Sequence, residues 1–175
     1  MVKEMGYLRE SVSIMSRYSR CKTDWFNHLR KTRATIKNAI GQTPANGKVV
    51  IFGAGLGYDL PLTQLTSHFS QVLLVDLVHT LPIRAKALFN KNVELVVRDV
   101  TESLTNIYEG RDEIYEPRGF LEDKKVGLVI SLNLLSQLAS LPVRFLEKHH
   151  GISENEADLI SQRIIQAHLT YLQKF

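Results

Sequence analysis

The chain has 175 residues, of which 44% are hydrophobic and 23% are charged. This balance is typical of one folded domain and excludes a chain that is disordered throughout. A single cysteine, Cys21, excludes an internal disulfide and favours a reducing compartment. No signal peptide is recognisable, and the most apolar runs are too short to span a bilayer. We therefore expect a cytoplasmic protein that does not cross a membrane.

The net charge of +4 is unevenly distributed along the chain. Seven basic residues and one acid, Asp24, lie between Arg17 and Lys37. A nucleic-acid or phosphate-bearing partner would explain such a segment, but a solvated helix face is the simpler explanation. No known nucleic-acid-binding motif and no interleaved aromatic residues are recognisable there, so we favour the solvated face.

The first 47 residues are predicted to be helical. Leu8, Val12 and Met15 fall on one face of a helix over residues 7–18. A second helix is predicted after a cap at Thr23 or Asp24, with Gly41 as its end and a loop over 42–47. Its apolar face would hold Trp25, Leu29, Ile36 and Ile40. Trp25 and Phe26 are expected either in the core or over a ligand pocket.

Residues 48–175 are predicted to form an α/β domain. Four short apolar runs, typical of parallel strands covered on both faces, occupy residues 48–52, 71–75, 93–97 and 126–132. Helices are expected between them over 59–68, 82–90 and 102–108, followed by a long surface loop over 109–125. Helical segments over 136–140 and 142–149 come next. Ser153 and Glu156 form a capping box that opens a final helix.

The first predicted strand ends in the sequence Gly53-Ala54-Gly55-Leu56-Gly57, which predicts a nucleotide-binding turn. Asp76 ends the second strand, 19 residues after Gly57, where a carboxylate can accept hydrogen bonds from ribose hydroxyls. Asp99 follows the third strand. The spacing does not fit the dinucleotide fingerprint, since Tyr58 stands at its sixth position, and no Walker-type Gly-Lys-Ser/Thr triplet occurs.

Residues 48–140 resemble a class I, Rossmann-like S-adenosylmethionine-dependent methyltransferase. The segments that carry the resemblance are 49–57, 72–76, 96–100 and 128–135. The resemblance implies a three-layer α/β sandwich whose parallel strands are ordered 3-2-1-4. It places the glycine turn on the methionine part of the cofactor, Asp76 on the ribose, Leu77 or Val78 beside the adenine, and Asp99 with Val100 on the adenine edge. The expected cofactor-binding residues are Gly53, Ala54, Gly55, Gly57, Asp76, Leu77, Asp99, Val100 and Asn133.

The chain departs from the family pattern at two places. Ile51 stands where many members carry an acid, and the sequence ends at Phe175, on what would be the helix before a fifth of seven strands. Three explanations are therefore open: the chain is truncated, the domain is reduced, or a partner completes the sheet. A second copy of the chain, in a homodimer, is one such partner. The unpaired fourth strand and the apolar final helix lead us to expect association.

The expected function is methyl transfer from S-adenosylmethionine to an acceptor that the sequence does not identify. The alternative is a non-catalytic binding or assembly domain of the same fold. No catalytic residue is assigned, because Asn133, Ser136 and Gln137 either orient an acceptor or cap a helix. No metal site is expected, since the adjacent His149 and His150 do not face the same way on a helix.

Overall fold

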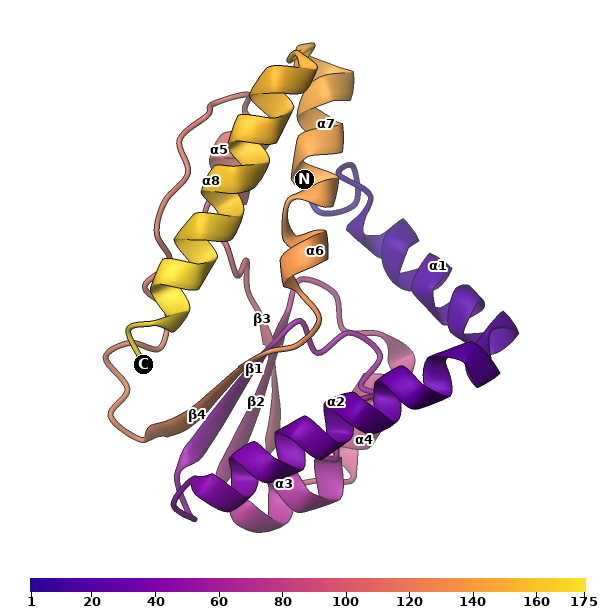
Figure 1. Cartoon of the computed structure of the whole chain (residues 1–175), viewed down its shortest axis with the longest axis vertical. Coiled ribbons are helices and arrows are strands. Elements are labelled where there is room, and N and C mark those ends of the chain that lie inside the picture. Colours follow the sequence, from indigo (N-terminus) through magenta and orange to yellow (C-terminus); the bar gives the residue numbers. More distant parts are fainter.

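Four strands form one parallel sheet in the computed structural model, which describes residues 1–175 (Figure 1). The strands are β1 (Lys48–Phe52), β2 (Gln71–Asp76), β3 (Val93–Val97) and β4 (Val126–Ser131). They lie in the order β3-β2-β1-β4, and Ile51 of β1 is in register with Leu74 and Ile130. The predicted α/β sandwich with the strand order 3-2-1-4 is confirmed.

One face of the sheet is covered by α2 (Lys22–Gln42), α3 (Leu62–His68) and α4 (Leu81–Leu88). Alternate residues of the central strands point to this side, since successive side chains of a strand face opposite ways. The resulting core contains Val49, Ile51, Val72 and Leu74 of the sheet with Ile36, Ile40, Leu65, Phe69 and Ile83 of the helices. Because both faces of β1 are covered, its residues from Val49 to Phe52 are all buried.

The opposite face packs against α8 (Glu154–Leu172), the last helix of the chain. Tyr171 inserts among Val50, Phe52, Leu73 and Val75, and its hydroxyl donates a hydrogen bond to the Gly119 carbonyl. This hydrogen bond attaches the long segment 109–125, which contains no helix or strand, as predicted. One part of the predicted final helix therefore covers the sheet.

The upper part of α8 belongs to a helical cluster beyond the carboxyl ends of the strands, together with α5 (Leu104–Tyr108), α6 (Leu135–Leu138) and α7 (Ser140–His150) (Figure 1). These helices share a second core, which includes Leu104, Ile107, Leu146, Ile160 and Ile164. The predicted capping box is present: the Ser153 hydroxyl accepts a hydrogen bond from the Glu156 backbone N–H, and the Glu156 side chain accepts one from Ser153. This capping box stabilises the first turn of α8, which follows the turn at Gly151.

Helix α1 (Tyr7–Arg20) has the opposite orientation to the one its apolar residues predict. Leu8 and Val12 are 49% and 51% exposed, and the helix contributes no buried residue. Its inward side carries Tyr7, Glu10 and Ser11 instead. The predicted helix is present, but the face that carries Leu8 and Val12 points outward, because α1 covers a partly polar pocket and only Tyr7 packs against a hydrophobic core.

Several predicted helix ends also need correction. α2 begins at Lys22 without a side-chain cap from Thr23 or Asp24, and it continues through Gly41 to Gln42. α3 begins at Leu62 and not at residue 59, because Pro61 disfavours helical backbone at the residue before it. α4 spans Leu81–Leu88 and α5 starts at Leu104. No helix combines the length and hydrophobicity needed to cross a bilayer.

The buried His168 of α8 leads us to expect that the stability of the folded chain depends on pH. Its side chain is fully buried, its Nε2 lies 2.9 Å from Ser131 Oγ, and its Nδ1 has no hydrogen-bond partner. Burial lowers the pKa of this imidazole, because a charged ring would bury an additional unpaired N–H. The unfolded chain therefore binds a proton near pH 6.5 that the folded chain binds only at a lower pH.

The free energy of unfolding is accordingly expected to fall as the pH drops below about 6.5, by at most about 1.4 kcal/mol per pH unit for this one group. Urea unfolding at pH 8 and pH 5.5 measures the difference. The His168→Gln variant should be less stable at pH 8 but should lose less stability between the two pH values. An equal loss in both proteins would show that other groups cause the pH dependence.

Candidate functional site

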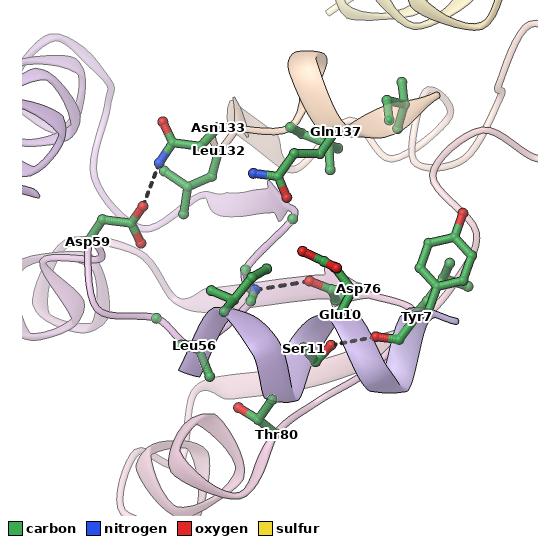
Figure 2. Close-up of a pocket in the computed structure, with 18 of the residues that line it drawn as sticks. Tyr7, Glu10, Ser11, Leu56, Asp59, Asp76, Thr80, Leu132, Asn133 and Gln137 are labelled. Atoms are coloured by element: carbon green, nitrogen blue, oxygen red, sulfur yellow. Dashed lines mark hydrogen bonds between the residues drawn. The ribbon is translucent and has the colours of Figure 1, made fainter. Parts of the chain in front are cut away.

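A pocket of about 680 Å³ opens at the carboxyl ends of all four strands (Figure 2). Its floor consists of the residues that follow each strand, and α1 and the first turns of α2 form one wall. The start of α7, with Ser140, Leu141 and Arg144, forms another wall. The strand order reverses at β1, because β2 and β3 follow on one side of it and β4 lies parallel on the other side. Ligands of open α/β sheets bind in the crevice at such a switch point.

All nine residues predicted to bind a cofactor line this pocket, although they come from four separate loops. They are Gly53, Ala54, Gly55, Gly57, Asp76, Leu77, Asp99, Val100 and Asn133. Trp25 also lines the pocket, whereas Phe26 is 62% exposed and lies outside it. The structure thus brings the predicted residues together around one cavity.

The glycine turn has two different reasons for lacking side chains. At Gly57, where φ is +62°, an added Cβ would lie 2.4 Å from Ile83 Cδ1 in the core below, so the turn requires glycine for packing. At Gly55, where φ is +50°, an added Cβ would meet no atom closer than the Gly53 carbonyl oxygen at 3.8 Å. The space beside Gly55 is therefore open, and a ligand can approach the backbone there.

Tyr58, directly after the turn, connects it to the surrounding helices. The Arg33 guanidinium of α2 donates a hydrogen bond to the Tyr58 carbonyl, and the ring of Tyr18 in α1 stacks on the Tyr58 ring at 4.0 Å. Lys86 of α4 donates a hydrogen bond of 2.8 Å to the Gly57 carbonyl. The expectation that a helix follows the glycines directly was wrong: α3 begins only at Leu62, so its first backbone N–H groups are not presented at the turn.

The Asp76 carboxylate connects the end of β2 to the glycine turn. Its Oδ2 accepts a 2.9 Å hydrogen bond from the Gly55 backbone N–H, and its Oδ1 accepts a 3.3 Å one from Val78. Figure 2 shows the carboxylate between the turn and α1. A carboxylate has about four acceptor positions, so both oxygens retain capacity for a ligand hydroxyl.

Asp99 has a structural role that the sequence did not reveal. Its Oδ1 accepts hydrogen bonds from the Thr101 backbone N–H at 2.8 Å and hydroxyl at 2.7 Å. Its Oδ2 accepts one from the Leu104 backbone N–H at 2.9 Å, which caps the start of α5. One acceptor position on Oδ2 therefore remains for a ligand. Leu77 and Val100 provide apolar lining beside it.

Asn133 and Asp59 form a polar pair on the opposite side of the pocket (Figure 2). The Asn133 Nδ2 donates a 2.7 Å hydrogen bond to Asp59 Oδ2, and Asn133 adopts the left-handed conformation with φ +51°. Burial raises the pKa of the Asp59 carboxyl above its usual value, although the hydrogen bond from Asn133 acts in the opposite direction. Sequence reasoning placed Asp59 in a helix and so missed it.

Helices α1 and α2 contribute further side chains that the sequence did not predict as part of the site. Tyr7, Glu10 and His28 all line the pocket. Burial raises the pKa of the Tyr7 hydroxyl, and the carboxylates of Asp99 and Asp76 add to this effect, so Tyr7 stays neutral. No local motif marks these residues, because only the tertiary fold brings α1 over the strand ends.

The charges that line the pocket are mostly negative. The carboxylates are those of Glu10, Asp24, Asp59, Asp76 and Asp99, against the guanidinium groups of Arg17 and Arg144. Arg17 is already paired with Glu10 in a salt bridge. An excess of carboxylates attracts cations and repels anions, so the pocket suits a ligand with positive groups better than one with phosphates.

The chain matches no protein-family model, no curated protein and no solved structure. What the pocket binds is therefore inferred from the pocket itself.

Proposed function

We propose that the pocket binds S-adenosylmethionine and that the protein transfers its methyl group to a separate acceptor. The observation that carries this proposal is the combination of an open glycine turn after β1 with an acceptor carboxylate, Asp76, at the end of the neighbouring β2. The volume of about 680 Å³ is in the range of pockets for ligands of this size.

Each part of the ligand has its own set of partners in the proposed arrangement. The Gly55 backbone would lie against the methionine part, and Asp76 would accept hydrogen bonds from the ribose hydroxyls. Leu77 and Val100 would flank the adenine, with the free position on Asp99 Oδ2 as an acceptor for its amino group. The amino group of the methionine part would be met by Asp59 or Glu10, since Ile51 is apolar and buried.

The charge of the pocket supports this ligand over other nucleotides. S-adenosylmethionine carries a sulfonium and an ammonium group, whereas NAD and ATP carry phosphates. Phosphates are commonly bound at a helix N-terminus that follows a glycine loop directly, and here α3 begins five residues after Gly57. The excess of carboxylates would add repulsion.

The proposed transfer requires little chemistry from the side chains. When bound, the cofactor supplies a methyl group that is already activated, so the protein's task is mainly to align the acceptor. If Glu10 meets the amino group of the cofactor, Asp59 is the proposed base for an acceptor that must lose a proton, because burial raises the pKa of its carboxyl. Asn133 would orient Asp59 through their hydrogen bond.

Titration calorimetry with four ligands tests the proposal. S-adenosylmethionine and S-adenosylhomocysteine are expected to bind, and NAD and ATP to bind at least about tenfold more weakly, a difference of about 1.4 kcal/mol. S-adenosylhomocysteine lacks the sulfonium charge, so the difference between the first two ligands reports how much the carboxylates contribute. Tighter binding of NAD than of S-adenosylhomocysteine would refute the assignment.

A further inference from the structure

A second hollow, of about 430 Å³, lies along α2, with Tyr18 of α1 at one end. We call it the basic groove, and its lining residues are Tyr18, Lys22, Phe26, Leu29, Arg30, Arg33, Ala34 and Lys37. Four of them are basic and none is acidic. Each lining residue of α2 lies one, three or four positions from the next, which places them in one stripe along the helix. From Lys22 to Lys37 this stripe extends roughly 22 Å at the rise of an α-helix.

The basic side chains of this groove are largely free to meet a ligand. Lys22, Arg30 and Lys37 are exposed, and none of them forms a salt bridge within the chain. Arg33 uses its guanidinium on the Tyr58 carbonyl. The segment 17–37 also accounts for the positive net charge, because the rest of the chain has slightly more acids than bases. The groove is therefore the most concentrated source of positive potential on this helix.

Phe26 adds an aromatic surface in the middle of the stripe. It lies one turn from Lys22 and one turn from Arg30, and it is 62% exposed. The Tyr18 ring, by contrast, already packs against other rings of the chain. Its centroid lies 4.0 Å from that of Tyr58 and 5.8 Å from that of Trp25. No interleaved aromatic residue was expected in this segment, and that expectation was wrong, because Phe26 alternates with basic residues only at helical spacing.

We propose that the basic groove binds a single-stranded nucleic acid, with phosphates on the basic residues and a base stacked on Phe26. Cations along a groove together with an exposed aromatic ring are the features by which proteins hold single strands. In a duplex the base faces are stacked inside and are not accessible to Phe26. An anionic membrane surface fits less well, because Phe26 is the only large apolar side chain exposed in the groove.

The groove is adjacent to the larger pocket. Leu29 lines both cavities, and Arg33 and Tyr18 both contact Tyr58, which lines the pocket. A strand held in the groove would therefore pass beside the pocket wall. Lys22, Phe26, Arg30 and Lys37 do not line the pocket, so nucleic-acid binding does not depend on the function proposed for it.

Fluorescence anisotropy of the full chain with a labelled 12-nucleotide oligouridylate, measured over a series of salt concentrations, tests the proposal. The double variant Arg30→Glu/Lys37→Glu is expected to bind at least tenfold more weakly. The slope of log K against log salt should become shallower by about 1.4, the value for two lost phosphate contacts to a single strand. Phe26→Ala should weaken binding about fivefold or more with the slope unchanged, because stacking releases no counterions.

A charge-matched control, Lys124→Glu/Lys148→Glu, changes two exposed lysines outside α1 and α2 and should keep nearly the wild-type affinity. Equal affinity of Phe26→Ala and wild type would overturn the proposal. Tighter binding of duplex than of single strand, or binding to anionic vesicles through the same residues, would overturn it as well. Calorimetry with S-adenosylhomocysteine on the Arg30→Glu/Lys37→Glu variant separates the two sites, since this variant should keep its cofactor affinity.

Discussion

Replacement of Asp76 by alanine is expected to lower the affinity for S-adenosylhomocysteine at least tenfold while the chain stays folded. The substitution removes the proposed acceptor of two ribose hydroxyls, and a hydrogen bond to a charged group contributes about 1.5–3 kcal/mol. It also removes the acceptor of the Gly55 backbone N–H, so the glycine turn loses its link to β2. Titration calorimetry measures the affinity, and circular dichroism reports the fold.

Asp76→Asn is the matched control for this prediction. Asparagine has nearly the same shape but retains a single acceptor oxygen, so its affinity should fall between those of wild type and alanine. Normal binding by a folded Asp76→Ala variant would show that Asp76 does not contact the ribose. An unfolded variant would show that the hydrogen bonds to Gly55 and Val78 serve mainly the fold.

Replacement of Ile164 by glutamate is expected to unfold most of the chain. Ile164 is 1% exposed in the second core, between α8 and the helices α5 and α7. A carboxylate there would be buried without a partner, which costs about 4 kcal/mol or more, a large part of the 5–15 kcal/mol that stabilises a typical domain. Urea unfolding and circular dichroism measure the loss.

Leu159→Glu on the same helix is the matched control, because Leu159 is 59% exposed. Its effect on the free energy of unfolding should stay within about 0.5 kcal/mol. It is also a suitable surface probe for association through α8, whereas Ile164 lies inside its own chain. Sedimentation of wild type and Leu159→Glu tests whether a homodimer forms through this face. Wild-type-like stability of Ile164→Glu would contradict the packing described for α8.

The sheet could be predicted from the sequence because its signals are local. A parallel strand covered on both faces needs a continuous apolar run, and residues 48–52, 71–75, 93–97 and 126–132 all show one. The glycine spacing and the acids after the second and third strands are local as well. Since the carboxyl ends of parallel strands meet at one edge, these residues could be predicted to lie together.

The walls of the pocket could not be predicted in the same way. The apolar residues of α1 predict a buried face, but periodicity does not reveal what a helix packs against, and α1 faces polar groups with Tyr7 and Glu10. Asp59 was missed because the helix start was expected before Pro61. Phe26 was missed because its neighbours Lys22 and Arg30 are separated from it along the chain and adjacent only on the helix.

Helix α1 has a consequence for the rate at which the pocket exchanges its contents. The helix forms a wall of the pocket, yet none of its residues is fully buried, and Tyr7 is the one that packs against the second core. Elements with few buried contacts open at a lower free-energy cost than the whole domain unfolds. The affinity for a ligand would then depend mainly on the glycine turn and Asp76. The residence time of the bound ligand would depend on how often α1 opens locally.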